Sequence, residues 1–233
     1  MSALEARDSS AGERDSASFS SAIEALRESI RRLEGGRIHW APRTCGVAVF
    51  DTLIGGLPSP GLVEIHGRPG SGRTRLVMTL VARLTGLGTS VALVDPACVL
   101  YPPAIVDLGV DLDRLLIVHP PGKGRMSLAD RGVPLDWESW AIEQLLRSGC
   151  FPVVVAIEPR VRGRAGYRWE RACQAGGCTG IVIRRHASRG LPAQVRLALD
   201  GGGVVVVRDR TGHGPPGRRH TAPASPVKWG LAS

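Results

Sequence analysis

Several patterns are scarce or missing in this chain, and each absence excludes a class of protein. No apolar run approaches the ~20 residues that a membrane-spanning helix requires, and the first residues lack a signal-peptide pattern. The five cysteines form no C-x-x-C pair, which argues against a zinc site or a disulfide framework. Four of the histidines also lack metal-ligand spacing: His119, His186, His213 and His220. We therefore expect a cytoplasmic globular protein with no metal site and no membrane association.

Lysine is almost absent, because Lys123 and Lys228 are its only copies, and arginine supplies most of the cations behind the net charge of +9. The segment 159–196 is dense in arginine and contains a single acid, Glu170. Such a cluster indicates an anionic partner, either DNA or an acidic protein surface. The alternative is a solvated surface, since aromatic residues make up only 4% of the chain. The candidate contacts are Arg160, Arg162, Arg164, Arg168, Arg184 and Arg185.

Composition divides the chain into four parts. Residues 1–18 are rich in Ser, Ala, Asp and Glu, and we expect them to be disordered. Residues 19–36 are expected to form an amphipathic helix, residues 37–208 a globular core, and residues 209–233 a flexible basic tail. The helix has a narrow apolar stripe that could dock on a partner or pack on its own domain. The stripe is formed by Ile23, Leu26, Ile30 and Leu33.

Strand and helix patterns alternate through the core. Apolar runs of buried-strand type occur at 62–66, 90–95, 115–118, 153–157 and 180–183. Helical patterns separate most of them, at 74–87, 102–108, 137–147 and 167–175. Segments 194–199 and 204–208 form an expected hairpin. This order predicts an α/β fold with a mainly parallel sheet, helices on both faces and a C-terminal hairpin.

The first core strand runs into the spacing Gly67-x4-Gly72-x-Thr74, which is typical of a phosphate-binding loop. Such loops bind phosphate through backbone N–H groups and through the N-terminus of the following helix. Arg73 stands where lysine is usual, and the larger planar guanidinium is not an equivalent replacement. The candidate cofactor-binding residues are Gly67, Gly70, Ser71, Gly72, Arg73 and Thr74.

The residues around this loop resemble bacterial RecA recombinases. The resemblance rests on Phe50-Asp51-x3-Gly55-Gly56-Leu57-Pro58, on Val94-Asp95-Pro96-Ala97, and on the segment 108–116. It implies a RecA-like P-loop core. The step from Leu100 to Pro103 and the short C-terminal half look most like ImuA proteins, RecA-like partners encoded in bacterial mutagenesis cassettes with translesion polymerase subunits.

By this resemblance, two catalytic groups are missing. The glutamate that activates water in RecA aligns with Ala97, and the carboxylate that orders magnesium aligns with Ile157. Glu158 is one residue late, and on a strand that shift moves a side chain to the opposite face. Because phosphoryl transfer depends on positioning and electrostatics, we expect no ATPase activity. Nucleotide binding without turnover stays open, and no cofactor is assigned.

The resemblance to ImuA implies a regulator that binds RecA, restrains recombination and promotes translesion synthesis in the SOS response. Its partners would be RecA and the polymerase subunits of the same cassette. Three alternatives remain: a DNA-binding accessory module, an ATP-binding protein with weak turnover, and a cell-division inhibitor of SulA type. The well-formed spacing of the phosphate loop disfavours the last.

Overall fold

The structure, a computed structural model, describes residues 41–120 and 136–221. The expected disordered segment 1–18 and the expected helix 19–36, with its stripe Ile23, Leu26, Ile30 and Leu33, lie outside these residues. The rest of the basic tail beyond residue 221 lies outside them as well.

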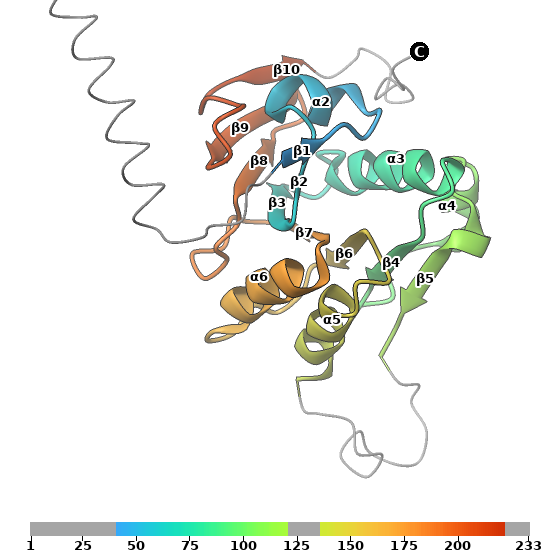
Figure 1. The fold of residues 1–233 in the computed structure, drawn as a ribbon. Helices are drawn as coiled ribbons and strands as arrows, with labels where there is room; N and C mark the ends of the chain where they lie inside the picture. The colour runs from blue at the N-terminus through green and yellow to red at the C-terminus, as the bar shows by residue number, and fades with distance from the viewer. Residues whose placement is uncertain (1–40, 121–135, 222–233) are drawn as a thin grey trace, which may run out of the picture. The chain divides into compact units, whose positions relative to one another are not determined.

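An eight-stranded sheet forms the centre of the fold (Figure 1), in the order β10-β9-β8-β3-β7-β6-β4-β5. The six strands from β8 to β5 run parallel. Their bounds are β8 Val195–Leu199, β3 Gly61–Gly67, β7 Thr179–Arg184, β6 Val153–Ile157, β4 Val91–Val94 and β5 Leu115–Val118. Strands β9 (Gly203–Asp209) and β10 (Arg219–Thr221) extend the sheet antiparallel.

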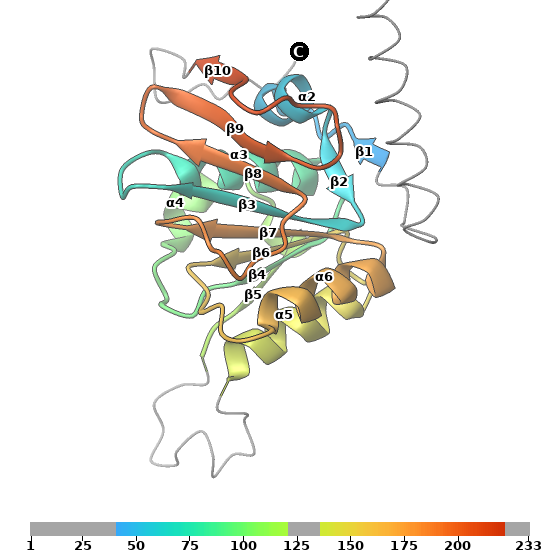
Figure 2. The same cartoon turned by 90° about the vertical axis from the view of Figure 1, so that its left-hand side faces the viewer.

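Helices cover both faces of the sheet, as Figure 2 shows. On one face lie α2 (Ala48–Ile54), α3 (Arg73–Gly86) and α4 (Pro102–Val106), whose apolar residues share a core with Val63 and Ile65 of β3. On the other face, α5 (Trp137–Arg147) and α6 (Ala165–Gly176) share a core with Leu62 of the same strand. Alternate residues of one strand thus serve two cores, which explains why the parallel strands are apolar throughout.

The predicted architecture is confirmed: an α/β fold with a mainly parallel sheet, helices on both faces and an antiparallel C-terminal hairpin of β8 and β9. The tail boundary expected at 209 falls inside the sheet, because β9 includes Asp209 and β10 pairs with β9. Two short strands, β1 (Ala41–Arg43) and β2 (Leu57–Ser59), form a separate antiparallel pair that the sequence did not indicate. Within the described ranges, no helix is long and apolar enough to cross a membrane.

Candidate functional site

The phosphate loop joins β3 to α3 at the carboxyl edge of the sheet. Gly70 and Gly72 have φ angles of 80° and 88°, in the left-handed region that favours glycine. A Cβ atom on Gly67 would lie 2.5 Å from the carbonyl oxygen of Leu199. The glycines therefore have a steric purpose in this loop, and the loop leads directly into a 14-residue helix.

Arg73, in the first turn of α3, does not project freely from the loop. Its Nη1 donates to the carbonyl oxygen of Gly67, and its Nη2 forms an ion pair with Oε1 of Glu158. The Arg73 side chain is only 11% exposed and that of Glu158 is 29% exposed. The cation at the lysine position of the loop is thus already neutralised by a carboxylate of the same chain.

The orientation of Glu158 corrects the expectation that it would face away from the loop. Glu158 follows β6 with φ 48°, a left-handed conformation that is uncommon for a residue with a side chain. This turn breaks the alternation of the strand, so Ile157 points into the core while Glu158 still reaches Arg73. The other carboxylate oxygen of Glu158, Oε2, accepts from the backbone N–H of Arg185 at 3.2 Å.

Several buried polar atoms of the described residues lack a hydrogen-bond partner. Nε2 of His66, Oγ of Ser71 and Nε of Arg73 belong to the end of β3, the loop and the first turn of α3, whereas Nε of Arg83 and Oδ1 of Asp95 lie elsewhere. Burial lowers the pKa of His66, and the nearby Arg196 and His186 lower it further against the opposing effect of Glu64. Two of these atoms, Ser71 Oγ and Arg73 Nε, are donors that suit a phosphate oxygen. The donor set of the loop therefore fits phosphate groups.

The same residues are less well suited to hydrolysing a nucleotide bound with magnesium. Ala97, in the position that aligns with the water-activating glutamate, lines a cavity of about 290 Å³ and offers no proton acceptor. Glu158, one residue after the position that aligns with the magnesium-ordering carboxylate, is engaged by Arg73. No group of three or more His, Cys, Asp or Glu residues in the described ranges could hold a metal ion.

The cavity shares Glu158 with the ion pair of Arg73 and is lined by residues that follow β4 and β6 and by the start of α5: Pro96, Ala97, Asp136, Trp137, Glu138, Glu158, Arg160 and Arg162. Burial raises the pKa of Glu138 against the opposing hydrogen bond from the backbone N–H of Arg160. The lining of the cavity therefore combines an indole, carboxylates and guanidinium groups.

The predicted arginine contacts separate into paired and unpaired groups. Arg168 pairs with Glu143 at 3.0 Å, and Arg160 and Arg185 lie 4.0 and 3.9 Å from Glu138 and Glu158. For Arg162, Arg164 and Arg184, no ion pair occurs within residues 41–120 and 136–221.

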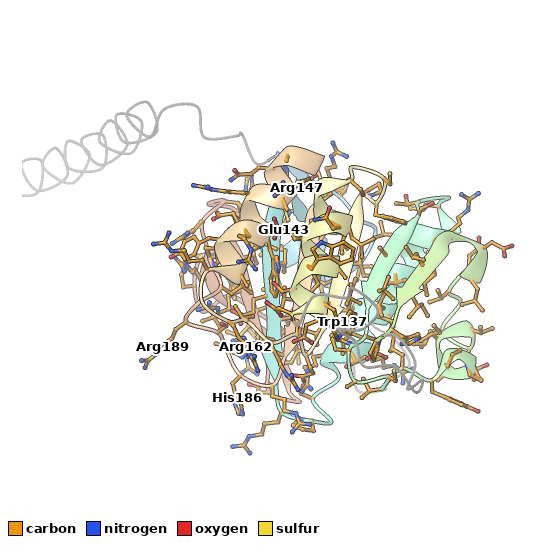
Figure 3. All side chains as sticks on the ribbon, turned by 90° about the horizontal axis from the view of Figure 1, so that it is seen from below. Trp137, Glu143, Arg147, Arg162, His186 and Arg189 are labelled. Atoms are coloured by element: carbon orange, nitrogen blue, oxygen red, sulfur yellow. The ribbon has the colours of Figure 1, made fainter. Side chains whose placement is uncertain are left out.

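Figure 3 shows Arg162, His186 and Arg189 at the same end of the molecule, with Trp137 alongside. We call Arg162, Arg164, Arg184, His186 and Arg189 the basic surface. It follows the carboxyl ends of β6 and β7, close to the loop that contains Glu158. Sequence reasoning missed Trp137 as a neighbour of Arg162, because the two residues lie at the start of α5 and after β6 and only the fold brings them to the lining of one cavity.

The fold and the loop define an α/β protein of the P-loop type with a RecA-like sheet. The RecA N-terminal domain family matches residues 29–155, more than half of the chain, so the chain belongs to this family. A solved structure described as the RadB recombinase superposes with a TM-score of 0.59, covering 79% of this chain and 96% of that chain. At 19% identity this likeness shows the fold alone.

Three Protein RecA sequences illustrate how far the similarity extends. The protein of Haemophilus ducreyi is 34% identical over 103 residues, which is 44% of this chain and 24% of that protein. The protein of Acidothermus cellulolyticus is 36% identical over 121 residues, which is 48% of this chain and 31% of that protein. The protein of Synechococcus elongatus is 31% identical over 141 residues, which is 57% of this chain and 36% of that protein. The chain therefore spans about a quarter to a third of the relatives it matches.

Proposed function

We propose that this protein is a non-catalytic RecA-like regulator that binds RecA recombinase, restrains homologous recombination and promotes SOS mutagenesis through translesion synthesis. The observation that carries the proposal is the ion pair between Arg73 and Glu158 in a RecA-family phosphate loop. It engages the cation that would meet the terminal phosphates. Together with alanine at position 97, it favours a fold that acts through its surfaces and not through phosphoryl transfer.

The open edge of the sheet supports a RecA-like partner. Strand β5 pairs with β4 on one side and has no strand on its other side within the described residues. Exposed apolar side chains lie on β5 and on the segments that lead into it: Val99, Tyr101, Val106, Leu112 and Leu116. An extended segment of a recombinase could add to this edge as a further strand, with these side chains supplying specificity. Bound in this way, this protein would compete with the contacts between protomers that build a recombinase filament.

A pull-down with purified RecA and a strand-exchange assay test the proposal. We expect micromolar binding and a slower strand exchange when this protein is added. Leu116→Asp, on the open edge, should weaken both effects, whereas Val207→Asp on β9 makes the same kind of change on an exposed residue of another strand and should not. Leu26→Asp tests the helix expected over 19–36 in the same way. No binding and no inhibition at micromolar protein would reject the proposal.

A second candidate function, a DNA-binding accessory module of the translesion polymerase complex, is favoured by the basic surface. Its arginines have no acidic partner in the described part of the chain, and Trp137 beside them offers a face on which a base could stack. Anisotropy with labelled single-stranded DNA at several salt concentrations tests this function. Replacing Arg162, Arg164 and Arg189 together by alanine should make the plot of log affinity against log salt concentration less steep, by the amount expected for the loss of about three phosphate contacts.

The matched control for the DNA experiment is Arg147→Ala. Arg147 is similarly exposed, but it pairs with Glu143 at 2.7 Å on α5, away from the basic surface in Figure 3. We expect its loss to leave the affinity for DNA unchanged. An equal loss of affinity in both variants would indicate nonspecific attraction to a basic protein, and no binding at low salt would remove this candidate.

A further inference from the structure

We infer that Glu158 is an internal counter-anion of the phosphate loop. It holds Arg73 when no phosphate is bound, and a polyphosphate binds only by taking Arg73 away from it. The loop is therefore self-inhibited, not misshapen. This inference concerns the loop alone and does not depend on whether RecA is the partner.

The contacts of Arg73 show why the two anions exclude each other. Both terminal nitrogens of its guanidinium are engaged, Nη1 by the carbonyl oxygen of Gly67 and Nη2 by Glu158. The side chain is only 11% exposed, so little of the guanidinium is open to solvent. A phosphate that reached the loop would meet a carboxylate already held by its cation, and two anions close together in a poorly solvated site repel each other strongly.

The rest of the loop keeps features that suit a phosphate. The hydroxyl Oγ of Ser71 is buried without a partner, and so is Nε of Arg73. The glycine conformations are those of a curled loop, and the backbone N–H groups of the first turn of α3 have no carbonyl within the helix to bond. The obstacle to phosphate binding is therefore the ion pair, because the donors themselves are present.

Arg185 provides the place to which the displaced carboxylate moves. Its backbone N–H already donates to Oε2 of Glu158 at 3.2 Å, and its Nε lies 3.9 Å from Oε1. When phosphate takes Arg73, Glu158 keeps a cationic partner and no charge is left unpaired. The carboxylate thus passes from the loop toward the basic surface at the end of β7, which links occupancy of the loop to the charge of that surface.

The test is binding of inorganic tripolyphosphate and of ATP to the full chain by calorimetry, without magnesium. Glu158→Gln should bind both about tenfold more tightly than the wild type, the amount expected for removal of one charge-assisted competitor. Asp136→Asn is the matched control: it removes the same charge from the same cavity but leaves Arg73 paired. A gain for ATP alone would assign the site to nucleotides, and a gain for both to polyphosphates in general.

Two outcomes would overturn the inference: unchanged affinity in Glu158→Gln, or an equal gain in Asp136→Asn, which would reflect general electrostatics. Arg185→Gln should change phosphate affinity in the opposite direction: it removes the alternative partner of Glu158 and should weaken phosphate binding. Tighter binding in that variant would contradict the proposed transfer of Glu158 from Arg73 to Arg185. If Glu158→Gln does not fold, Glu158→Asp applies the same test, with a smaller gain expected from the shorter carboxylate.

Discussion

The carboxylate of Glu64 and the guanidinium of Arg196 form an ion pair between neighbouring strands in the interior of the sheet. The two residues are register partners on β3 and β8, Glu64 is fully buried, and Arg196 is 16% exposed. Glu64 also accepts from the backbone N–H of Ser188 at 2.6 Å, and Arg196 donates to the carbonyl oxygen of Ser188. The pair therefore fixes the connection between β7 and β8 as well as the strand register.

Removing one member of this pair should be costly. Glu64→Ala leaves a largely buried guanidinium without its anion, and we expect the free energy of unfolding to fall by about 3 kcal/mol. Arg219→Ala is the control, because Arg219 pairs with Asp200 in an exposed position, where screening by water leaves an ion pair with little effect on stability. Urea denaturation measures both. Equal losses would show that burial of the first pair has no energetic weight.

Two helical glycines differ in their surroundings, and alanine should distinguish them. A Cβ atom on Gly176, at the end of α6, would lie 2.0 Å from the carbonyl oxygen of Leu146 on α5. A Cβ atom on Gly86 of α3 would meet nothing within 4 Å. We expect Gly176→Ala to destabilise the protein by about 1–3 kcal/mol and Gly86→Ala to be neutral or to stabilise it by about 0.5 kcal/mol. Thermal unfolding of the two variants checks the difference.

His66 should make stability depend on pH in the mildly acidic range. Burial lowers its pKa in the folded protein, so the unfolded chain binds the proton more readily. Stability should fall as the pH drops below about 6.5, the ordinary histidine value. His66→Gln should reduce the difference between urea midpoints at pH 7.5 and pH 5.5. The same dependence in wild type and variant would assign the effect to other groups.

The cysteines should separate by reactivity. Cys98 and Cys150 are exposed, whereas Cys45, Cys173 and Cys178 are buried; burial raises the pKa of Cys45 to about 12. We expect iodoacetamide to modify only the exposed pair in the native protein. Exposure should therefore decide the reaction, and the three buried thiols are the internal control, which should react only when the protein is unfolded in urea.

ATP turnover should be undetectable in the wild-type protein. Ala97 cannot activate a water molecule, and loss of a general base typically removes about 10²–10⁴ in rate. A phosphate-release assay with RecA as positive control measures this. Turnover that Thr74→Ala abolishes would contradict the prediction, since it would show that the phosphate loop still supports ATP hydrolysis. Turnover that persists in that variant would point to a contaminating enzyme.

The fold could be predicted from the sequence because its signals are local. The apolar runs of β3, β4 and β6 and the glycines of the loop each indicate their structure within a few residues. The pair β1–β2 could not, because Pro58 and a length of three residues resemble a turn. Strand β10 was missed for a similar reason, since Arg219–Thr221 is a polar segment that becomes a strand only beside β9.

The site could be predicted only in part. The spacing around Thr74 identified the loop, but the partner of Arg73 is 85 residues away along the chain. The usual alternation of a strand placed Glu158 on the wrong face, because alternation ends where a residue adopts a left-handed conformation, and no pattern in the sequence marks that turn. Acids far away in the sequence also pair several arginines of the segment 159–196, which its composition could not reveal.

The positive φ of Glu158 has a consequence for local motion. A non-glycine residue in this conformation carries a backbone cost of roughly 1 kcal/mol, which the surrounding contacts must offset. The ion pair with Arg73 is one such contact, beside the hydrogen bonds of Glu158 with the backbone of Ile183 and Arg185, so its loss should loosen the turn after β6. In Arg73→Ala, amide hydrogen exchange should quicken at residues 158–160 while the strand before them keeps its protection.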